Sequence, residues 1–381
     1  MVSTLQETYV IRFEDDKGTT VSSVGGSDRS FLSSRTLAVS NIQQRIPGDG
    51  SNRSTYDDSS LVVQVVPEGI LLLNYDPNLR EYARIGSLWT LDKFSDGNVA
   101  NWANREIVAA DINASQVVIA LNHGTLALLI FEGDRFVKKR TREFIEPPPF
   151  NCTAEISAVT CLPLDSTKPY AVNIAVGFWM SKVVKVLSLL ERGTFRDVCE
   201  TAKLPAAPRS LLLFNFTNES GNSPKSHPHL LIGLVDGSLA TFPFQNGTLG
   251  DQKLISIGTL PVTMHTCRIR DRSTVFACGN RTSILFWERE RLQHSPLMLK
   301  VRIITSLQCY PGSASAARIQ DISAATELNT VAYPSSVILA SSDSLVIGAV
   351  ANFDKLHIRS VCCNSMIFSP SSDHWIDSSG L

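Results

Sequence analysis

The sequence predicts an all-β fold, namely a β-propeller with about six to seven four-stranded, WD40-like blades. Apolar hairpins recur along nearly the whole chain of 381 residues. Their turn centres lie roughly 45–70 residues apart, which is the length of a four-stranded blade with variable loops. A β-sandwich with several hairpins is the alternative, but sandwich turns usually follow one another every ~8–12 residues without this longer repeat.

The clearest hairpin is Leu230–Phe244, reading LLIGLVDGSLATFPF. Two apolar runs flank Asp236-Gly237, and Asp-Gly favours the type I′ turn because that turn needs positive φ at both central residues. Five similar hairpins are expected, and all consist of an apolar run, a turn of small or polar residues and a second apolar run. They are Leu61–Tyr75, Val117–Phe131, Val172–Leu189, Thr274–Trp287 and Ser344–Val361.

Further strands are expected between the hairpins, where short apolar runs would complete neighbouring blades. The candidates are Tyr9–Phe13, Phe31–Val39, Ile85–Leu91, Glu106–Ile112, Ile156–Leu164 and Leu211–Phe216. Polar or Ala/Ser-rich stretches predict loop insertions near 43–60 and 309–336, and helix is expected only there, with Ala314–Glu327 helical or disordered. One propeller domain is therefore predicted over 1–361, followed by an irregular tail over 362–381. If Met1 falls inside the propeller and not at its start, the ring is short of a blade.

Composition excludes several classes. The net charge is −1, which gives no support for broad electrostatic binding to nucleic acid or to a membrane. No apolar run reaches the length of a membrane span, and the N-terminus does not read as a secretory signal. The eight cysteines form no C-x-x-C pair, and this scatter indicates a reducing compartment.

No motif predicts catalysis or a cofactor. The sequence lacks a G-x-S-x-G elbow, a P-loop, a dinucleotide fingerprint and an H-E-x-x-H helix. His123 and His265 have no nucleophile or orienting carboxylate suggested beside them. His227 and His229 lack a third metal ligand in their loop. We therefore expect a protein that is not an enzyme and that needs no metal or other cofactor.

Two features could mark a binding surface. Arg135–Arg142, reading RFVKKRTR, fits either a phosphate-binding or nuclear-localisation patch or a solvated strand edge, and Glu143 favours the edge. Trp179, flanked by Phe178 and Met180, falls at the turn of a hairpin whose strands are otherwise aliphatic. Both an exposed binding aromatic and a cap of the blade core fit that position. By contrast, Trp89 and Trp287 lie within or at the end of strands and are expected in the core.

Seven short motifs follow one another along the chain: Ala175–Trp179 (AVGFW), Pro208–Leu212 (PRSLL), Gly233–Leu239 (GLVDGSL), Gly247–Asp251 (GTLGD), Gly258–Pro261 (GTLP), Val275–Cys278 (VFAC) with Arg281, and Lys355–Val361 (KLHIRSV). In order and at compatible spacing, they resemble the family of the large subunit of the UV-damaged DNA-binding complex, the damaged-DNA-binding protein 1 family. That family shares a superfamily with the large cleavage-and-polyadenylation factor subunit and a splicing-factor subunit.

The resemblance implies the second of three propellers in a much longer protein. It implies a scaffold that docks the N-terminal region of cullin-4 in a RING ubiquitin ligase acting in DNA repair. Substrate receptors would bind through the neighbouring propellers, damaged DNA would be contacted only indirectly, and the protein would be nuclear and also cytoplasmic. A nucleic-acid-binding subunit of an RNA 3′-end processing or splicing complex is the alternative.

The resemblance also assigns site residues. Trp179 matches the family tryptophan that faces the cullin, and its neighbours Phe178 and Met180 would share that interface. A family glutamate at the same interface falls on Ala158 here, with Glu155 close by.

Overall fold

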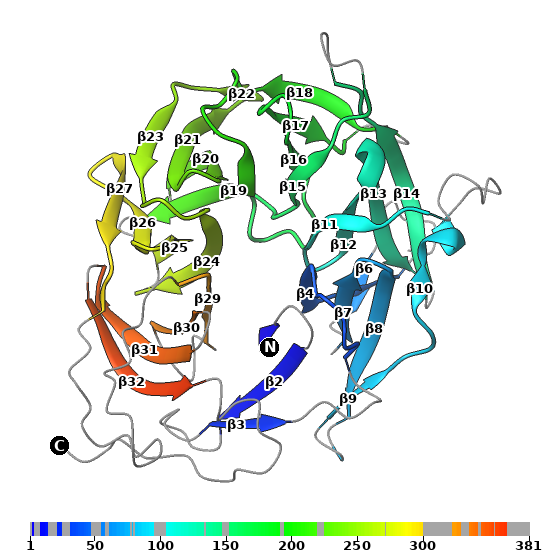
Figure 1. Ribbon diagram of the computed structural model, residues 1–381, viewed down its shortest axis with the longest axis horizontal. Helices are drawn as coiled ribbons and strands as arrows, with labels where there is room; N and C mark the ends of the chain where they lie inside the picture. Colours follow the sequence, from blue (N-terminus) through cyan, green and yellow to red (C-terminus); the bar gives the residue numbers. More distant parts are fainter. Residues whose placement is uncertain are drawn as a thin grey trace.

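The computed structural model describes most of the chain as a ring of β-sheets around a central axis (Figure 1). The described residues are 2–3, 8–13, 21–24, 31–46, 55–57, 61–76, 78, 81–94, 104–132, 135–146, 152–190, 194–218, 225–270, 272–299, 322–328, 335–341, 344–353 and 355–363. Within them, six sheets contain four or more strands and a seventh contains three. The predicted all-β propeller is therefore confirmed.

We number the blades 1 to 7 along the chain. Blade 1 contains β1 (Val2–Ser3), β2 (Thr8–Phe13) and β3 (Val21–Val24). Blade 2 contains β4 (Ala38–Asn41), β7 (Leu61–Val66), β8 (Gly69–Asp76), β9 (Glu81–Arg84) and β10 (Trp89–Thr90). Blade 3 contains β11 (Ile107–Ile112), β12 (Gln116–Leu121), β13 (Thr125–Glu132) and β14 (Arg135–Glu143), and its sheet also includes β5 (Gln44–Ile46) and β6 (Thr55–Asp57).

Blade 4 contains β15 (Ile156–Thr160), β16 (Asn173–Phe178), β17 (Val184–Ser188) and β18 (Arg196–Glu200), and blade 5 contains β19 (Pro208–Asn218), β20 (Lys225–Leu234), β21 (Ser238–Gln245), β22 (Thr248–Leu249) and β23 (Lys253–Ser256). Blade 6 contains β24 (Thr263–Ile269), β25 (Arg272–Cys278), β26 (Ser283–Glu288) and β27 (Arg291–Pro296). Blade 7 contains β28 (Met298–Leu299), β29 (Ala324–Glu327), β30 (Ser336–Ala340), β31 (Ser344–Asn352) and β32 (Lys355–Cys363).

All six predicted hairpins are present as antiparallel strand pairs. Five of them, such as β16–β17 and β20–β21, are the second and third strands of a blade, whereas β31–β32 are the third and fourth strands of blade 7. In the hairpin at Asp236-Gly237, Gly237 has φ +85°, and an added Cβ would lie 2.3 Å from the Gly258 carbonyl oxygen. Glycine is required there because a residue with a side chain is strained at positive φ, and because the Gly258 carbonyl leaves no space for a Cβ atom. Of the other predicted strands, Tyr9–Phe13 and Glu106–Ile112 match β2 and β11 to within one residue, whereas Ile156–Leu164 and Leu211–Phe216 differ from β15 and β19 by several residues.

Three expectations need correction. The segment from Phe31 to Leu37 is not a strand, because the Gln64 amide accepts a hydrogen bond from Leu32 N–H and donates others to the Leu32 carbonyl and the Thr36 hydroxyl. The predicted strand over Ile85–Leu91 is interrupted at Gly86 (φ +70°). Ala324–Glu327 forms β29 and not a helix, since it pairs with β30, whereas residues 314–321 lie outside the described residues.

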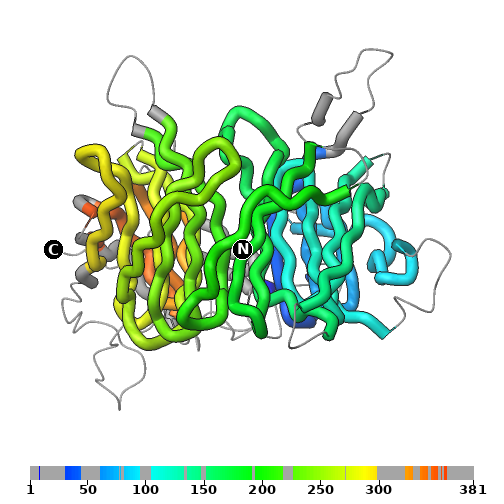
Figure 2. The backbone as a smooth tube through the Cα atoms, turned by 90° about the horizontal axis from the view of Figure 1, so that it is seen from above, coloured from blue at the N-terminus to red at the C-terminus, as the bar shows by residue number. Residues whose placement is uncertain are grey.

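Each blade buries both faces of its central strands, so the core is divided among the interfaces between blades. In β12, for example, Val117 and Ile119 pack toward blade 2, while Val118 and Ala120 pack toward blade 4. This explains why the central strands read as continuous apolar runs and not as alternating ones. Viewed edge-on in Figure 2, the strands cross the thickness of the ring, so the turns gather on its two faces.

One face collects the turns between second and third strands together with the connections into the next blade. Backbone hydrogen bonds join the two kinds of loop repeatedly: Trp179 N–H donates to Glu155 O at 2.9 Å, and Ile257 N–H donates to Gly237 O at 3.0 Å. We call this surface the Trp179 face.

Candidate protein-binding surface

The turn that carries Trp179 is held on three sides. Phe178 N–H donates to Val183 O at 3.1 Å and closes the turn, while Lys182 adopts φ 56°. Trp179 N–H donates a hydrogen bond to Glu155 O, and Leu204 N–H donates one to Lys182 O at 2.9 Å. The turn is therefore fixed between the loops that enter blades 4 and 5, which orders its side chains before any partner arrives.

The three residues predicted for the interface differ in exposure. Trp179 is 38 % exposed and Met180 is 47 % exposed. Phe178 is only 2 % exposed, and its ring packs edge-on against Phe144 with the centroids 5.1 Å apart. Phe178 therefore belongs to the blade core and has no side-chain surface for a partner, which corrects its assignment as an interface residue. The correction follows from strand alternation, because adjacent residues point to opposite faces.

A third exposed apolar side chain, missed by sequence reasoning, lies beside this turn. Ile145 is 75 % exposed, although its neighbours Phe144 and Glu146 are buried. Phe144 contacts Phe178, and Glu146 contacts Ser181, so the segment that carries Ile145 is joined to the turn that carries Trp179 and Met180. We call Ile145, Trp179 and Met180 the apolar patch. No signal in the sequence distinguished Ile145, because an isoleucine that follows Phe144 at the end of a strand is as easily interpreted as a core residue.

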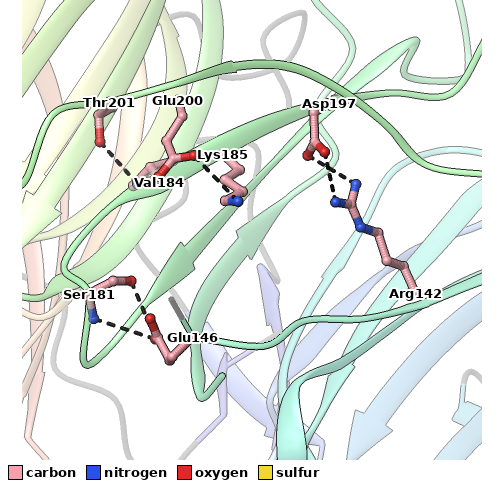
Figure 3. A network of polar contacts seen from close by, with 8 residues as sticks. All are labelled: Arg142, Glu146, Ser181, Val184, Lys185, Asp197, Glu200 and Thr201. Carbon is pink, nitrogen blue, oxygen red and sulfur yellow. Dashed lines mark hydrogen bonds and ion pairs between the residues drawn. The ribbon is translucent and has the colours of Figure 1, made fainter. Parts of the chain in front are cut away.

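Glu146 fixes the position of the patch. Its side chain is buried, and its carboxylate accepts hydrogen bonds from the Ser181 N–H at 3.4 Å and the Ser181 hydroxyl at 3.3 Å (Figure 3). The loop that carries Ile145 is thus joined to the turn that carries Met180. Because a buried carboxylate is costly unless it is bonded, the two segments are expected to move as one unit.

Exposed charge borders the patch. Glu155 is exposed, and its carbonyl oxygen bonds Trp179, whereas Ala158 is buried in β15. Of the two positions considered for the family glutamate, only Glu155 lies at the surface beside Trp179.

The basic stretch Arg135–Arg142 forms most of β14, the outer strand of blade 3, which confirms the strand-edge interpretation. Arg142 donates two hydrogen bonds to the Asp197 carboxylate, at 3.0 and 2.7 Å (Figure 3). Arg140 donates to Leu189 O at 2.6 Å, and Lys139 pairs with Glu132 at 2.5 Å. These cations join blade 3 to blade 4 or pair within blade 3, so they are not available as a phosphate-binding cluster.

The histidines considered as ligands or bases have other surroundings. The His227 ring stacks on Trp287 with centroids 3.9 Å apart, and His229 is buried beside the same indole. Desolvation by burial lowers the pKa of His229 and of His265. No group of three or more His, Cys, Asp or Glu able to hold a metal occurs within the described ranges.

The remaining aromatic and thiol predictions are consistent with structural roles. Trp89 packs on Phe136 and Trp287 on the blade 5 histidines, which confirms both indoles as core-packing groups. Burial raises the pKa of Cys161 well above its usual range and raises that of Cys199 to about 11. These thiols therefore stay protonated near neutral pH and are weak nucleophiles.

A family model of the second β-propeller of RSE1/DDB1/CPSF1 proteins matches residues 1–350. The chain belongs to this family. Proteins named DNA damage-binding protein 1 from Drosophila melanogaster and Oryza sativa are each 28 % identical to it, over 271 and 257 residues. These matches cover 69 % and 67 % of this chain but 20 % of each relative. The chain thus spans about one fifth of the length of the curated relatives it matches.

Solved structures resemble the RSE1/DDB1/CPSF1 propeller in fold alone. A protein from Lactobacillus plantarum aligns with TM-score 0.56 at 11 % identity, covering 93 % of this chain and 92 % of that protein. A candidate 6-phosphogluconolactonase from Bacteroides fragilis aligns with TM-score 0.54 at 10 % identity, covering 92 % of this chain and 88 % of the other. At such identities the second likeness carries no argument for lactonase activity. No helix among the described residues is long and apolar enough to cross a membrane.

Proposed function

We propose that this chain is a non-enzymatic scaffold propeller that docks the helical N-terminal region of cullin-4 within a ubiquitin ligase acting in DNA repair. Family membership supports a scaffold role, and the curated relatives are named for DNA damage binding. By the same resemblance, substrate receptors bind neighbouring propellers of a longer protein, damaged DNA is contacted only through partners, and the complex acts in the nucleus and also in the cytoplasm.

One observation carries the cullin proposal: Trp179, the residue that matches the cullin-facing family tryptophan, is partly exposed in a turn that also carries exposed Met180 and is joined to the segment of exposed Ile145. Large apolar residues on an ordered loop are suited to bind a helix, because they bury area with little loss of entropy. The fixed turn also reduces the ordering cost of docking. Trp179 and Met180 contribute to this proposed interface, and Ile145 adds a third contact.

The nucleic-acid-binding alternative has less support. Two of the three arginines of β14, Arg140 and Arg142, are hydrogen-bonded within the ring. The chain also carries a net charge of −1.

The test is direct binding of the purified chain to the cullin-4 N-terminal region, measured in parallel with binding to single-stranded RNA and duplex DNA at several salt concentrations. Saturable cullin binding that Trp179→Ala weakens supports the proposal. Absence of cullin binding, together with nucleic-acid binding that falls steeply with salt, would replace it with the alternative, because phosphate contacts release counterions.

A further inference from the structure

The inner strands of three consecutive blades contain a β-bulge at the same position. β11, β15 and β19 each shift register against their partner strand one residue after they begin. The extra residues are Val108, Ser157 and Arg209. By contrast, the inner strands β4, β24 and β29 pair without a shift over their described registers. The bulges are therefore confined to blades 3, 4 and 5.

These bulges lie beside the apolar patch. Blade 4 carries Trp179, and Glu155, whose carbonyl binds Trp179 N–H, directly precedes β15. Each bulge is thus at the end of an inner strand that meets the Trp179 face. A bulge changes the direction of a side chain, and bulges concentrate next to functional sites.

Ser157, in the middle bulge, has an unusual environment. Its side chain is 7 % exposed, and its hydroxyl has no hydrogen-bond partner within the described part of the chain. An unpaired buried hydroxyl is unfavourable. The bulge at Ser157 is therefore not explained by a hydrogen bond that its side chain gains.

Arg209, in the third bulge, is the charged member of the set. It is exposed, and within the described residues it makes neither a hydrogen bond nor an ion pair. Its neighbour Pro208 lies so close to Gly177, two residues before Trp179, that a Cβ added at Gly177 would meet the proline ring at 2.8 Å. Arg209 therefore presents an unpaired guanidinium next to the strand that leads into the patch. This contrasts with Arg142, which is bound to Asp197.

We infer that Arg209 is a specificity-determining residue of the docking surface and forms an ion pair with a carboxylate of the partner helix whose apolar side chains contact the patch. This inference rests on the proposed cullin docking. A guanidinium binds a carboxylate through two parallel hydrogen bonds and so defines orientation as well as attraction. A phosphate would also suit arginine, but the neighbouring apolar side chains and exposed Glu155 favour a protein partner over an RNA. Such a charge at the rim of an interface mainly sets register and association rate.

The test compares Arg209→Glu, Arg209→Lys and the control Arg281→Glu for binding to the cullin-4 N-terminal region by biolayer interferometry at low and high salt. Arg281 is exposed on the second-to-third-strand turn of blade 6, on the same face. We expect Arg209→Glu to weaken binding about tenfold at low salt, chiefly through association rate, with a smaller effect at high salt. Arg209→Lys should be intermediate, and Arg281→Glu should bind like the wild type.

A second arm changes each Asp and Glu of the partner helix to Arg in turn, and one such variant should restore binding to Arg209→Glu. Equal affinity of Arg209→Glu and wild type, while Trp179→Ala is weakened, would overturn the Arg209 assignment and leave cullin docking intact. Loss of RNA binding without loss of cullin binding would also overturn it. If wild type does not bind the cullin, both proposals fail. Equal melting temperatures for all variants confirm that folding is unaffected.

Discussion

Glu146 and Ser181 join two segments that lie 35 residues apart in the sequence, through a buried carboxylate that accepts both the backbone N–H and the hydroxyl of Ser181. One segment presents Ile145 to solvent, and the other presents Trp179 and Met180. The apolar patch therefore depends on a polar contact beneath it. Changes at Glu146 should affect binding although its own side chain is not exposed.

The first prediction concerns this contact. Glu146→Ala leaves the Ser181 donors without their buried acceptor, and we expect a loss of about 1–3 kcal/mol in the free energy of unfolding, together with weaker cullin binding. Chemical denaturation and binding titration on one sample measure both effects. Glu143→Ala is the matched control, because the Glu143 side chain is 67 % exposed. A Glu146→Ala protein as stable as the Glu143→Ala protein would contradict the anchoring role.

The second prediction separates two adjacent aromatic residues. Trp179→Ala should weaken cullin binding by about 2 kcal/mol or more, roughly thirtyfold, because the indole is partly exposed at the proposed interface. Its cost in folding should be about 1 kcal/mol, whereas Phe178→Ala removes a buried ring and should cost about 3–5 kcal/mol. Melting curves and titrations of both variants are the measurement. A collapsed melting temperature with unchanged affinity for Trp179→Ala would assign the indole to the core.

The third prediction concerns the contact between blades 3 and 4. Arg142 binds both Asp197 carboxylate oxygens and the Phe195 carbonyl, and its guanidinium lies 4.7 Å from the Phe144 ring centroid. Arg142→Met should lower the unfolding free energy by about 1 kcal/mol, a modest value because the pair is partly exposed to solvent.

Lys185, also drawn in Figure 3, provides the control for Arg142. It makes a single contact of 3.4 Å with Glu200, so Lys185→Met should cost less than about 0.5 kcal/mol. Equal destabilisation by the two changes, measured by urea unfolding, would argue against a special role for Arg142.

The fourth prediction concerns pH. Desolvation by burial lowers the pKa of His229 below its ordinary 6.5 in the folded protein, although the hydrogen bond to the His227 carbonyl opposes it; smaller charge effects of His227 and Lys253 act in the lowering direction. The unfolded chain therefore takes up protons first as the pH falls. The contribution of neutral His229 to the free energy of unfolding should be fully present above pH 6.5. It should decrease as the pH falls from 6.5 through the lower pKa of the folded protein. His265, shifted in the same direction, should add to this effect.

Melting temperatures measured between pH 5 and 8 test this expectation. His229→Phe should flatten the profile, because it removes the titrating group and keeps an aromatic ring between Phe216 and Trp287. His123→Gln is the control, since that side chain is exposed and lies outside this cluster. An unchanged slope in His229→Phe would assign the pH dependence to other groups.

Local sequence patterns were sufficient for most of the fold. Apolar runs such as Val117–Phe131, together with turns such as Asp236-Gly237, determine hairpins through interactions within about fifteen residues, and their spacing along the chain indicated blades. Strand bounds were less predictable where a distant side chain intervenes. Gln64, for example, holds the loop at Leu32 across a separation of 32 residues.

The candidate site was only partly predictable. The residues alone left open whether Trp179 is a binding aromatic or a cap of the blade core, and the family resemblance assigned it to an interface. Trp179 is partly exposed, but the assignment included buried Phe178 and missed Ile145. Ile145 is distinguished from a core isoleucine only by Phe144 and Glu146, which turn inward to meet Phe178 and Ser181. Likewise, the stretch RFVKKRTR gives no sign that Arg142 is bound to Asp197, 55 residues away.

Sequence patterns alone predict β-hairpins repeated at the spacing of propeller blades, because the preference for a turn between two apolar strands is local. Which side chains remain at the surface and which charges are paired depends instead on how neighbouring blades pack. That packing brings together residues that are distant in the sequence, such as Glu146 and Ser181, which are 35 residues apart. For the same reason, the position of Arg209 next to the strand that leads to Trp179 became apparent only once strand register and blade order were known.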